Sequence, residues 1–214
     1  MRFYRFNTLL IGILGAFILV GCGNSNSKGQ ASSSSSASAR QNSKQPRVVL
    51  TEYADFQCPT CGYFYPIVKK LKKTYGDTLK VRYRYFPLNS HSHSRLAARA
   101  AQAARNQGKF QAMHDMLFKN QDKWDDSGNP QQIFIDYAKR IGLNIKKFKK
   151  DLNAAKTQKI VMQQKKEGEK RGVNSTPTFF INGEEVTSLP RNFKQFKALL
   201  DIYVKEARHK AKHG

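Results

Sequence analysis

The sequence predicts an α/β fold in which a β-α-β segment and a β-β-α segment enclose a block of helices. An apolar run over residues 48–56 is typical of a buried strand, and apolar residues alternate with basic ones over residues 79–85, which indicates a second strand. A third strand at residues 178–181 ends at an Asn-Gly pair at residues 182–183, a pattern that predicts a hairpin. Between the two segments, apolar residues recur at helical spacing over much of residues 91–171.

Helix signals follow the first strand and fill the middle of the chain. Pro59 suits the first turn of a helix that Gly76 ends, and Pro66 inside it removes one backbone hydrogen bond and predicts a kink. A last helix carries an apolar face over residues 193–207, and Val186 is expected to extend the partner strand of the hairpin. The helices of the middle block are predicted at residues 96–104, 110–117, 133–141, 145–152 and 154–170.

The N-terminal stretch is predicted to be an export signal rather than part of the core. Basic residues precede an apolar run at residues 9–20, which is shorter than the roughly 18–20 residues that a membrane-spanning helix needs. The Leu-Val-Gly-Cys sequence at residues 19–22 resembles a bacterial lipobox. We therefore expect residues 1–21 to be a lipoprotein signal peptide and Cys22 to carry a lipid anchor. An ordinary signal peptide that happens to contain a cysteine is the alternative.

A tether and a folded domain are expected to follow the signal. Residues 22–46 contain a serine run and lack aromatic and branched apolar side chains, so they cannot offset the entropy of ordering and are predicted to be disordered. The folded domain is expected to cover residues 47–208, followed by a short basic tail at residues 209–214. We expect the tether to hold this domain off the membrane.

The charge balance is strongly basic, with 38 Lys and Arg against 15 Asp and Glu and a formal net charge of +23. Such an excess suits nucleic acid, but the predicted export signal argues against that partner. The basic residues are scattered along helices rather than gathered with stacking aromatics, which is typical of solvated faces. An anionic membrane or cell-wall surface is therefore the favoured neighbour.

Three cysteines are present, and assigning Cys22 to lipid leaves the pair Cys58 and Cys61. A structural disulfide across so short a loop would stabilise the fold little through chain entropy, so a lone Cys-x-x-Cys pair in an oxidising compartment indicates redox chemistry. Cys58 follows a strand and precedes a helix, where free N–H groups and the helix dipole lower a thiol pKa. We expect Cys58 to be the exposed attacking thiolate and Cys61, one turn on, to be the buried resolving thiol.

Three motifs make the sequence resemble the DsbA-like branch of the thioredoxin superfamily over residues 48–208. They are Phe56-Gln57-Cys58-Pro59-Thr60-Cys61, Phe86-Pro87-Leu88 after the second strand, and the run from Gly172 through Thr176-Pro177 to Gly183. The resemblance implies a thioredoxin-like fold with a helical insertion over about residues 91–171. That insertion separates this branch from plain thioredoxins.

The resemblance also implies roles for residues outside the cysteine pair. Thr176-Pro177 matches the family's cis-proline, which faces the cysteines, and Thr176 would offer backbone groups to an extended substrate chain. Glu52 lies where the family carries a buried carboxylate with a raised pKa that exchanges a proton with Cys61; a solvent-facing glutamate is the alternative. Thr60 replaces the histidine of the most oxidising members, and because it carries no positive charge we expect weaker oxidising power.

No metal and no dissociable cofactor is expected. His91 and His93 do not have the close paired spacing with the cysteines that zinc sites show, and we interpret them as polar residues at the entry of a helix. His114 is interpreted as a structural histidine with satisfied hydrogen bonds. Trp124 and the aspartates around it are interpreted as a surface loop, with a cation site as the alternative.

These observations predict a lipid-anchored, extracytoplasmic enzyme that oxidises thiols of exported proteins through Cys58 and Cys61. The resemblance implies reoxidation by a quinone-linked membrane protein or by a small-molecule oxidant. Two alternatives stay open. One is a disulfide reductase or isomerase of the same fold, which Thr60 favours, and the other is a surface lipoprotein that binds a partner without catalysis.

Overall fold

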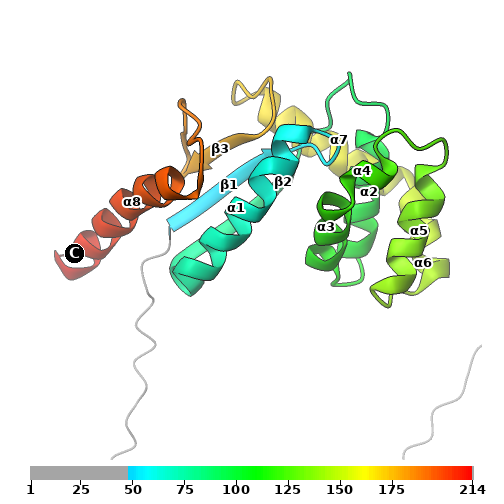
Figure 1. Ribbon diagram of the computed structural model, residues 1–214, viewed down its shortest axis with the longest axis horizontal. Helices are drawn as coiled ribbons and strands as arrows, with labels where there is room; N and C mark the ends of the chain where they lie inside the picture. Colours follow the sequence, from blue (N-terminus) through cyan, green and yellow to red (C-terminus); the bar gives the residue numbers. More distant parts are fainter. Residues whose placement is uncertain (1–47, 214) are drawn as a thin grey trace, which may run out of the picture. The chain divides into compact units, whose positions relative to one another are not determined.

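The computed structural model describes residues 48–213 and shows a four-stranded sheet with a group of helices to one side of it (Figure 1). The sheet half consists of β1 (Val48–Ala54), α1 (Pro59–Tyr75), a 3-10 turn (Gly76–Thr78), β2 (Leu79–Tyr85), β3 (Thr178–Ile181), β4 (Glu184–Glu185) and α8 (Phe193–His213). The helical insertion between β2 and β3 consists of α2 (Ser94–Arg105), α3 (Phe110–Lys119), α4 (Gln121–Trp124), α5 (Pro130–Arg140), α6 (Ile145–Asn153) and α7 (Ala155–Glu169). The predicted fold class, α/β with a helical insertion, is confirmed.

Strand β1 lies inside the sheet, whose order is β2-β1-β3-β4. It pairs in parallel with β2 and antiparallel with β3, and β3 pairs antiparallel with β4. All of its residues are buried except Val49 and Ala54, which are half-buried. A strand that is covered on both faces is mostly apolar in sequence, which explains the composition of this segment. The cysteine motif follows directly after this buried strand.

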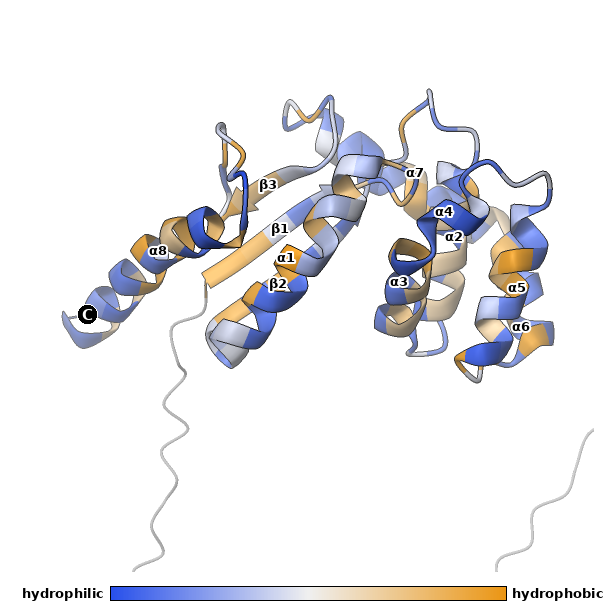
Figure 2. Ribbon diagram, viewed as in Figure 1, coloured by the Kyte–Doolittle hydropathy of each residue, from blue (hydrophilic) through white to orange (hydrophobic). Residues whose placement is uncertain are grey.

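Helix α1 has two buried faces that belong to different hydrophobic cores. Phe64, Val68 and Leu71 pack in the core formed with the sheet and α8. Cys61 and Tyr65 pack instead in the core of the helical insertion. Both sets follow the three- and four-residue spacing of one helix face, so α1 joins the two halves of the molecule. Figure 2 shows β1 as hydrophobic over its first part and more hydrophilic towards its end, and α1 as a mixture of hydrophobic and hydrophilic residues.

The predicted end of α1 is confirmed. Gly76 caps the helix at a φ of 52°, a conformation that glycine adopts without a steric cost. Pro66 lies inside α1, as the sequence indicated, and is exposed.

The interpretation of the Trp124 region as a surface loop is wrong. Residues Gln121–Trp124 form the short helix α4, and Trp124 is 0% exposed. The indole Nε1 donates a hydrogen bond to the Leu117 carbonyl at 2.9 Å, and the ring packs edge-on against Phe134 with centroids 5.2 Å apart. A polar helix of four residues is too short to show a helical repeat of apolar residues, so the sequence pattern could not predict it.

Some predicted boundaries also differ from the structure. Strand β4 ends at Glu185 and does not include Val186, although the Val186 N–H donates to the Phe179 carbonyl at 2.8 Å. The first strand ends at Ala54 rather than Phe56, because the carboxylate of Asp55 accepts a hydrogen bond from the Gln57 N–H at 2.9 Å and starts a turn. Helix α8 continues to His213, through residues expected to form a basic tail. The predicted signal peptide, Cys22 and the tether lie outside the described residues.

Candidate active site

The cysteine pair lies where the chain passes from β1 into α1. Cys58 is the N-cap residue of α1, with an extended backbone (φ −72°, ψ 122°), and its carbonyl accepts the N–H of Gly62 at 3.1 Å. Within residues 48–213 no side chain caps this helix start. The N–H groups of Thr60 and Cys61 reach the Cys58 sulfur instead and favour its anion.

The two thiols differ in burial and in acidity. Cys58 is 6% exposed and Cys61 is 0% exposed. A hydrogen bond from Cys61, followed by one from the Thr176 side chain and by the N–H groups of the first turn, lowers the pKa of Cys58 to about 5 against the opposing effect of burial. Burial raises the pKa of Cys61 well above its ordinary value, and the bond to Cys58 and the charge of Glu52 add to this. The prediction of an exposed Cys58 is wrong in degree, because only a small part of its surface reaches solvent.

The Thr176–Pro177 peptide bond is cis, as the resemblance implied. The Cys58 thiol donates a hydrogen bond to the Thr176 carbonyl across 3.3 Å. The loop that contains Thr176 therefore covers part of the Cys58 sulfur. The Thr176 hydroxyl is buried, and the Thr176 side chain contributes to the lowered pKa of Cys58. Thr60 is exposed on the first turn of α1. The structure thus brings Cys58, Thr60, Thr176 and Pro177 together where β1 ends and where α1 and β3 begin.

Glu52 is buried on β1, with 2% of its surface exposed, so a solvent-facing glutamate is excluded. It pairs in register with Tyr83 of β2 and Phe179 of β3. Burial raises the pKa of its carboxyl to about 8. When it is ionised, Glu52 raises the pKa of Cys61 through its negative charge. A weakly acidic carboxyl thus lies close enough to the buried thiol to influence it.

Asp55 is a residue of the site that sequence reasoning missed. Its carboxylate is buried and accepts hydrogen bonds from the N–H groups of Gln57 and Leu88, both at 2.9 Å, while Nδ1 of His91 lies 2.8 Å from it. Its carbonyl accepts the N–H of Cys58 at 3.2 Å. The sequence feature that could have identified Asp55 is an acidic residue at the end of an apolar strand. The structure assigns His91 to this carboxylate.

Gln57, inside the cysteine motif, ties the turn to the helical insertion. Its Nε2 donates to the carbonyl of Asp125 at 3.0 Å, and its Oε1 accepts the N–H of His93 at 2.7 Å. Gln121 of the insertion approaches the same turn. Neither glutamine was singled out in the sequence, because only the tertiary fold brings them to the cysteines.

His114 is buried in an aromatic environment, and its expected hydrogen bonds are only partly present. Nδ1 lies 3.4 Å from the Gln111 amide and 3.6 Å from the Asp115 carboxylate. No group among the residues described hydrogen-bonds to Nε2. Burial lowers the pKa of His114. Across residues 48–213 there is no cluster of three or more side chains that could hold a metal ion.

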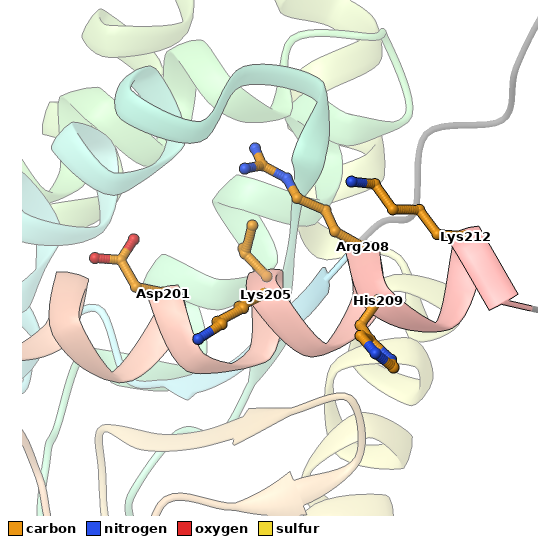
Figure 3. A pocket seen from close by; sticks show the side chains of 6 residues that line it. Asp201, Lys205, Arg208, His209 and Lys212 are labelled. Carbon is orange, nitrogen blue, oxygen red and sulfur yellow. The ribbon is translucent and has the colours of Figure 1, made fainter.

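A surface hollow of about 340 Å³ lies on the last turns of α8, away from the start of α1 (Figures 1 and 3). Its lining is mostly basic and consists of Asp201, Val204, Lys205, Arg208, His209 and Lys212. The lining includes none of the cysteine-site residues, so the candidate active site is the cysteine turn and not this hollow.

Comparison with known proteins assigns the family. A family model described as thioredoxin matches residues 40–202, and the chain belongs to this family. A thioredoxin-like oxidoreductase from Silicibacter pomeroyi is 27% identical with a TM-score of 0.62, covering 75% of this chain and 88% of that one. The fold is that of DsbA-like thiol–disulfide oxidoreductases, so the fold that the motifs implied is confirmed.

Two further structures share the fold at lower identity. α-DsbA1 from Wolbachia pipientis has a TM-score of 0.67 at 21% identity, covering 78% of this chain and 90% of that one. BdbD from Bacillus subtilis has a TM-score of 0.65 at 22% identity, covering 75% of this chain and 89% of that one.

Curated relatives are longer proteins named Na⁺/H⁺ antiporters. NhaA 1 of Mycobacterium sp. strain KMS is 39% identical over 142 residues, which are 64% of this chain and 22% of that protein. NhaA 3 of Salinispora tropica is 36% identical over 148 residues, which are 67% of this chain and 22% of that protein. The chain thus spans about a fifth of the length of these relatives. Among residues 48–213, no helix is long and apolar enough to cross a membrane.

Proposed function

We propose that this protein is an extracytoplasmic thiol–disulfide oxidoreductase that introduces disulfides into exported proteins. The observation that carries the proposal is the contrast within the cysteine pair: Cys58 has a pKa of about 5, whereas the pKa of Cys61 lies well above its ordinary value. A thiol that is a stable anion is a good leaving group, and a pair that contains one is readily reduced by substrate. The 27% identity to a thioredoxin-like oxidoreductase supports the same class of reaction.

The proposed reaction begins with the Cys58–Cys61 disulfide. A substrate thiolate attacks the Cys58 sulfur, and the S–S bond breaks with its electron pair on Cys61. Protonated Glu52, with a pKa of about 8, supplies the proton that the buried Cys61 thiolate needs. A second substrate thiolate then attacks the substrate sulfur of the mixed disulfide and releases Cys58 as a thiolate. The substrate loses two electrons, and its two thiol protons pass to solvent. The pair gains the two electrons and the proton from Glu52, which solvent then protonates again.

The neighbours of the pair are proposed to position the substrate. The carbonyl of Thr176 lies 3.3 Å from the Cys58 sulfur, within reach of a backbone N–H of an extended chain bonded to that sulfur. Such a chain would replace the bond that the free Cys58 thiol donates. Pro177 holds this loop over the pair, and Thr60, exposed on the first turn of α1, borders the approach to Cys58.

The location is proposed to be the outer face of a bacterial membrane. Residues 1–21 would be a signal peptide, Cys22 the lipidated residue and residues 22–46 the tether to the domain. The net charge of +23 and the basic hollow on α8 suit an anionic surface (Figure 3). Reoxidation is proposed to come from a quinone-linked membrane protein or a small-molecule oxidant.

Trapping tests this function. In cells that express the Cys61→Ala variant, mixed disulfides between Cys58 and exported proteins should accumulate, because the resolving thiol is missing. The Cys58→Ala variant is the matched control and should trap nothing. Absence of mixed disulfides under oxidising growth would contradict the proposal, and the trapped proteins would identify the substrates.

A reductase or isomerase role is a second candidate, and Thr60 is the observation that favours it. An uncharged side chain at this position stabilises the Cys58 thiolate less than a histidinium would. Equilibration with glutathione separates the two roles. A reduction potential close to that of thioredoxin would support the reductase, and a potential well above it would support the oxidase.

A further inference from the structure

The side-chain amide of Gln121, the first residue of α4, lies against the turn that carries Cys58. Its Nε2 donates to the carbonyl of Phe56 at 2.7 Å and to the carbonyl of Cys58 at 3.0 Å. These two carbonyls stand on either side of Gln57, so a single amide group holds both ends of the turn. The donor comes from the helical insertion, more than sixty positions further along the chain.

Gly62 provides the space that this amide occupies. A Cβ at position 62 would collide with Oε1 of Gln121 and would lie 3.3 Å from its Cδ. Gly62 lies inside α1 and is not among the residues with positive φ, so its backbone conformation does not require glycine. Glycine is unfavourable in a helix interior relative to alanine. The close approach of Gln121 therefore explains why α1 has no side chain here.

We propose that Gln121 is a positioning residue for Cys58, and that Gly62 is the gap in α1 that admits its amide. The inference rests on the proposed role of Cys58 as the attacking thiolate. Cys58 is the N-cap of α1, with an extended backbone (φ −72°, ψ 122°), and in this conformation the N–H groups of the first turn are aimed at its sulfur. By holding the carbonyls of Phe56 and Cys58, the amide keeps that aim.

Several groups brace this turn, and Gln121 is the side chain that holds its Phe56 carbonyl. The Asp55 carboxylate accepts the Gln57 N–H, and the Asp55 carbonyl accepts the Cys58 N–H. No side chain from residues 48–213 caps the start of α1, so the turn lacks the usual device that fixes an N-cap residue. The Gln57 side chain joins the turn to His93 and Asp125. The carbonyls of the two residues on either side of Gln57 accept hydrogen bonds from Gln121.

The Gln121→Ala variant tests the proposal in the full chain. With the amide gone, the Cys58 carbonyl keeps its helical bond from Gly62, but the turn is free to depart from the conformation that aims the N–H groups. We expect the midpoint of the Cys58 thiolate titration to rise by about 0.5–1 pH unit, which corresponds to a roughly 3–10-fold shift in the ionisation equilibrium. The reduction potential against glutathione should fall in step.

Gln107→Ala is the matched control. The Gln107 amide also braces backbone, since its Nε2 donates to the Asn144 carbonyl at 3.2 Å and its Oε1 accepts the Asn144 N–H at 3.0 Å. Both residues lie in the insertion and outside the cysteine turn. This variant should lose a similar amount of local structure and leave the titration of Cys58 unchanged.

Gly62→Ala tests the same contact from the opposite side. Alone, its methyl group should displace the Gln121 amide and reproduce the titration shift of Gln121→Ala. In the double variant no further shift is expected, and the melting temperature should rise above that of Gln121→Ala, because alanine is the better helix residue once the amide is absent.

Two results would overturn the proposal. One is a Cys58 titration in Gln121→Ala that matches wild type and Gln107→Ala. The other is an additive effect of the two substitutions in the double variant. If Gln121→Ala does not fold, Gly62→Ala alone decides, with an unchanged midpoint counting against the proposal. Since the titration reports the thiol itself, it remains informative even if the protein proves not to oxidise exported substrates.

Discussion

The two buried faces of α1 present the same helix to two different cores. Phe64, Val68 and Leu71 face the sheet and α8 and carry no polar group in their side chains. The other face, with Cys61 and Tyr65, meets the helical insertion. One face therefore contributes hydrophobic burial, and the other holds the reactive pair.

This contrast shows why the insertion matters to the chemistry. Cys58 and Cys61 lie on an element of the sheet half but pack in the core of the insertion, and glutamine side chains link their turn to that insertion. The sheet core fixes where α1 begins. The insertion fixes how the first turn is held. Changes on the two faces should therefore have separable effects, on stability in one case and on thiol reactivity in the other.

The largest expected effect comes from Cys58 itself. Cys58→Ala removes the one thiol among residues 48–213 whose pKa is lowered, so thiol–disulfide exchange with a small dithiol substrate should fall to the uncatalysed rate. The far-UV circular dichroism should stay that of wild type, because a small side chain replaces a similar one. Residual exchange well above the uncatalysed rate would show that Cys61 can attack alone.

A change in the sheet core should have the opposite pattern. Phe196 of α8 is fully buried and packs edge-on against Phe179 with centroids 5.0 Å apart. Phe196→Ala should lower the free energy of unfolding by about 3–5 kcal/mol, measured by urea denaturation. The Cys58 titration midpoint should not move. A shift of that midpoint would show that the two faces of α1 are not independent.

Glu52 gives a pH-dependent effect on stability. Burial raises the pKa of its carboxyl from an ordinary value of 4.5 to about 8, so the folded state binds the proton more tightly than the unfolded chain does. Stability from this group is full below about pH 4.5 and is lost as pH rises through about 8. Glu52→Gln should therefore raise the melting temperature by more at about pH 9 than at about pH 4, measured by thermal unfolding at each pH. An equal change at both values would contradict a buried, protonated carboxyl.

The smallest expected effect is that of Thr60→His. A histidinium on the exposed first turn of α1 adds a positive charge near the Cys58 thiolate, and exposed charge pairs contribute only about 0.2–1 kcal/mol. The reduction potential should rise by roughly 5–20 mV against glutathione at low salt, and less at high salt. A fall in potential would contradict the interpretation of Thr60 as a residue that weakens oxidising power.

Much of this architecture could be predicted from the sequence, because its elements carry strong local patterns. The buried strand before Cys58, the alternating strand ending at Tyr85 and the apolar face of the last helix all depend on side-chain period. Local pattern failed at Trp124, whose burial depends on packing between distant helices. The local pattern also predicted a more exposed Cys58 than the structure shows, because the loop at Thr176 that covers the sulfur is distant in the chain.

The site could be predicted only where a residue has a motif around it. Glu52 and Thr176 were found through the resemblance, and their burial and position agree with the implied arrangement. Asp55 and Gln121 have no such motif. Each acts through hydrogen bonds to the backbone of the turn, and a glutamine at a helix start looks like any solvated polar residue until the fold places it.

The ionisation of Cys58 tests the central claim most directly, through the ultraviolet absorbance of the thiolate in the reduced full chain with Cys22→Ser. The account predicts one transition near pH 5, absent in the matching Cys58→Ala variant, while Cys61 stays protonated into the alkaline range. In Cys61→Ala the transition should persist at a higher midpoint, because the hydrogen bond from Cys61 is the largest cause of the lowered pKa. A transition at the ordinary thiol value in wild type, or one near pH 5 that survives in Cys58→Ala, would contradict the account.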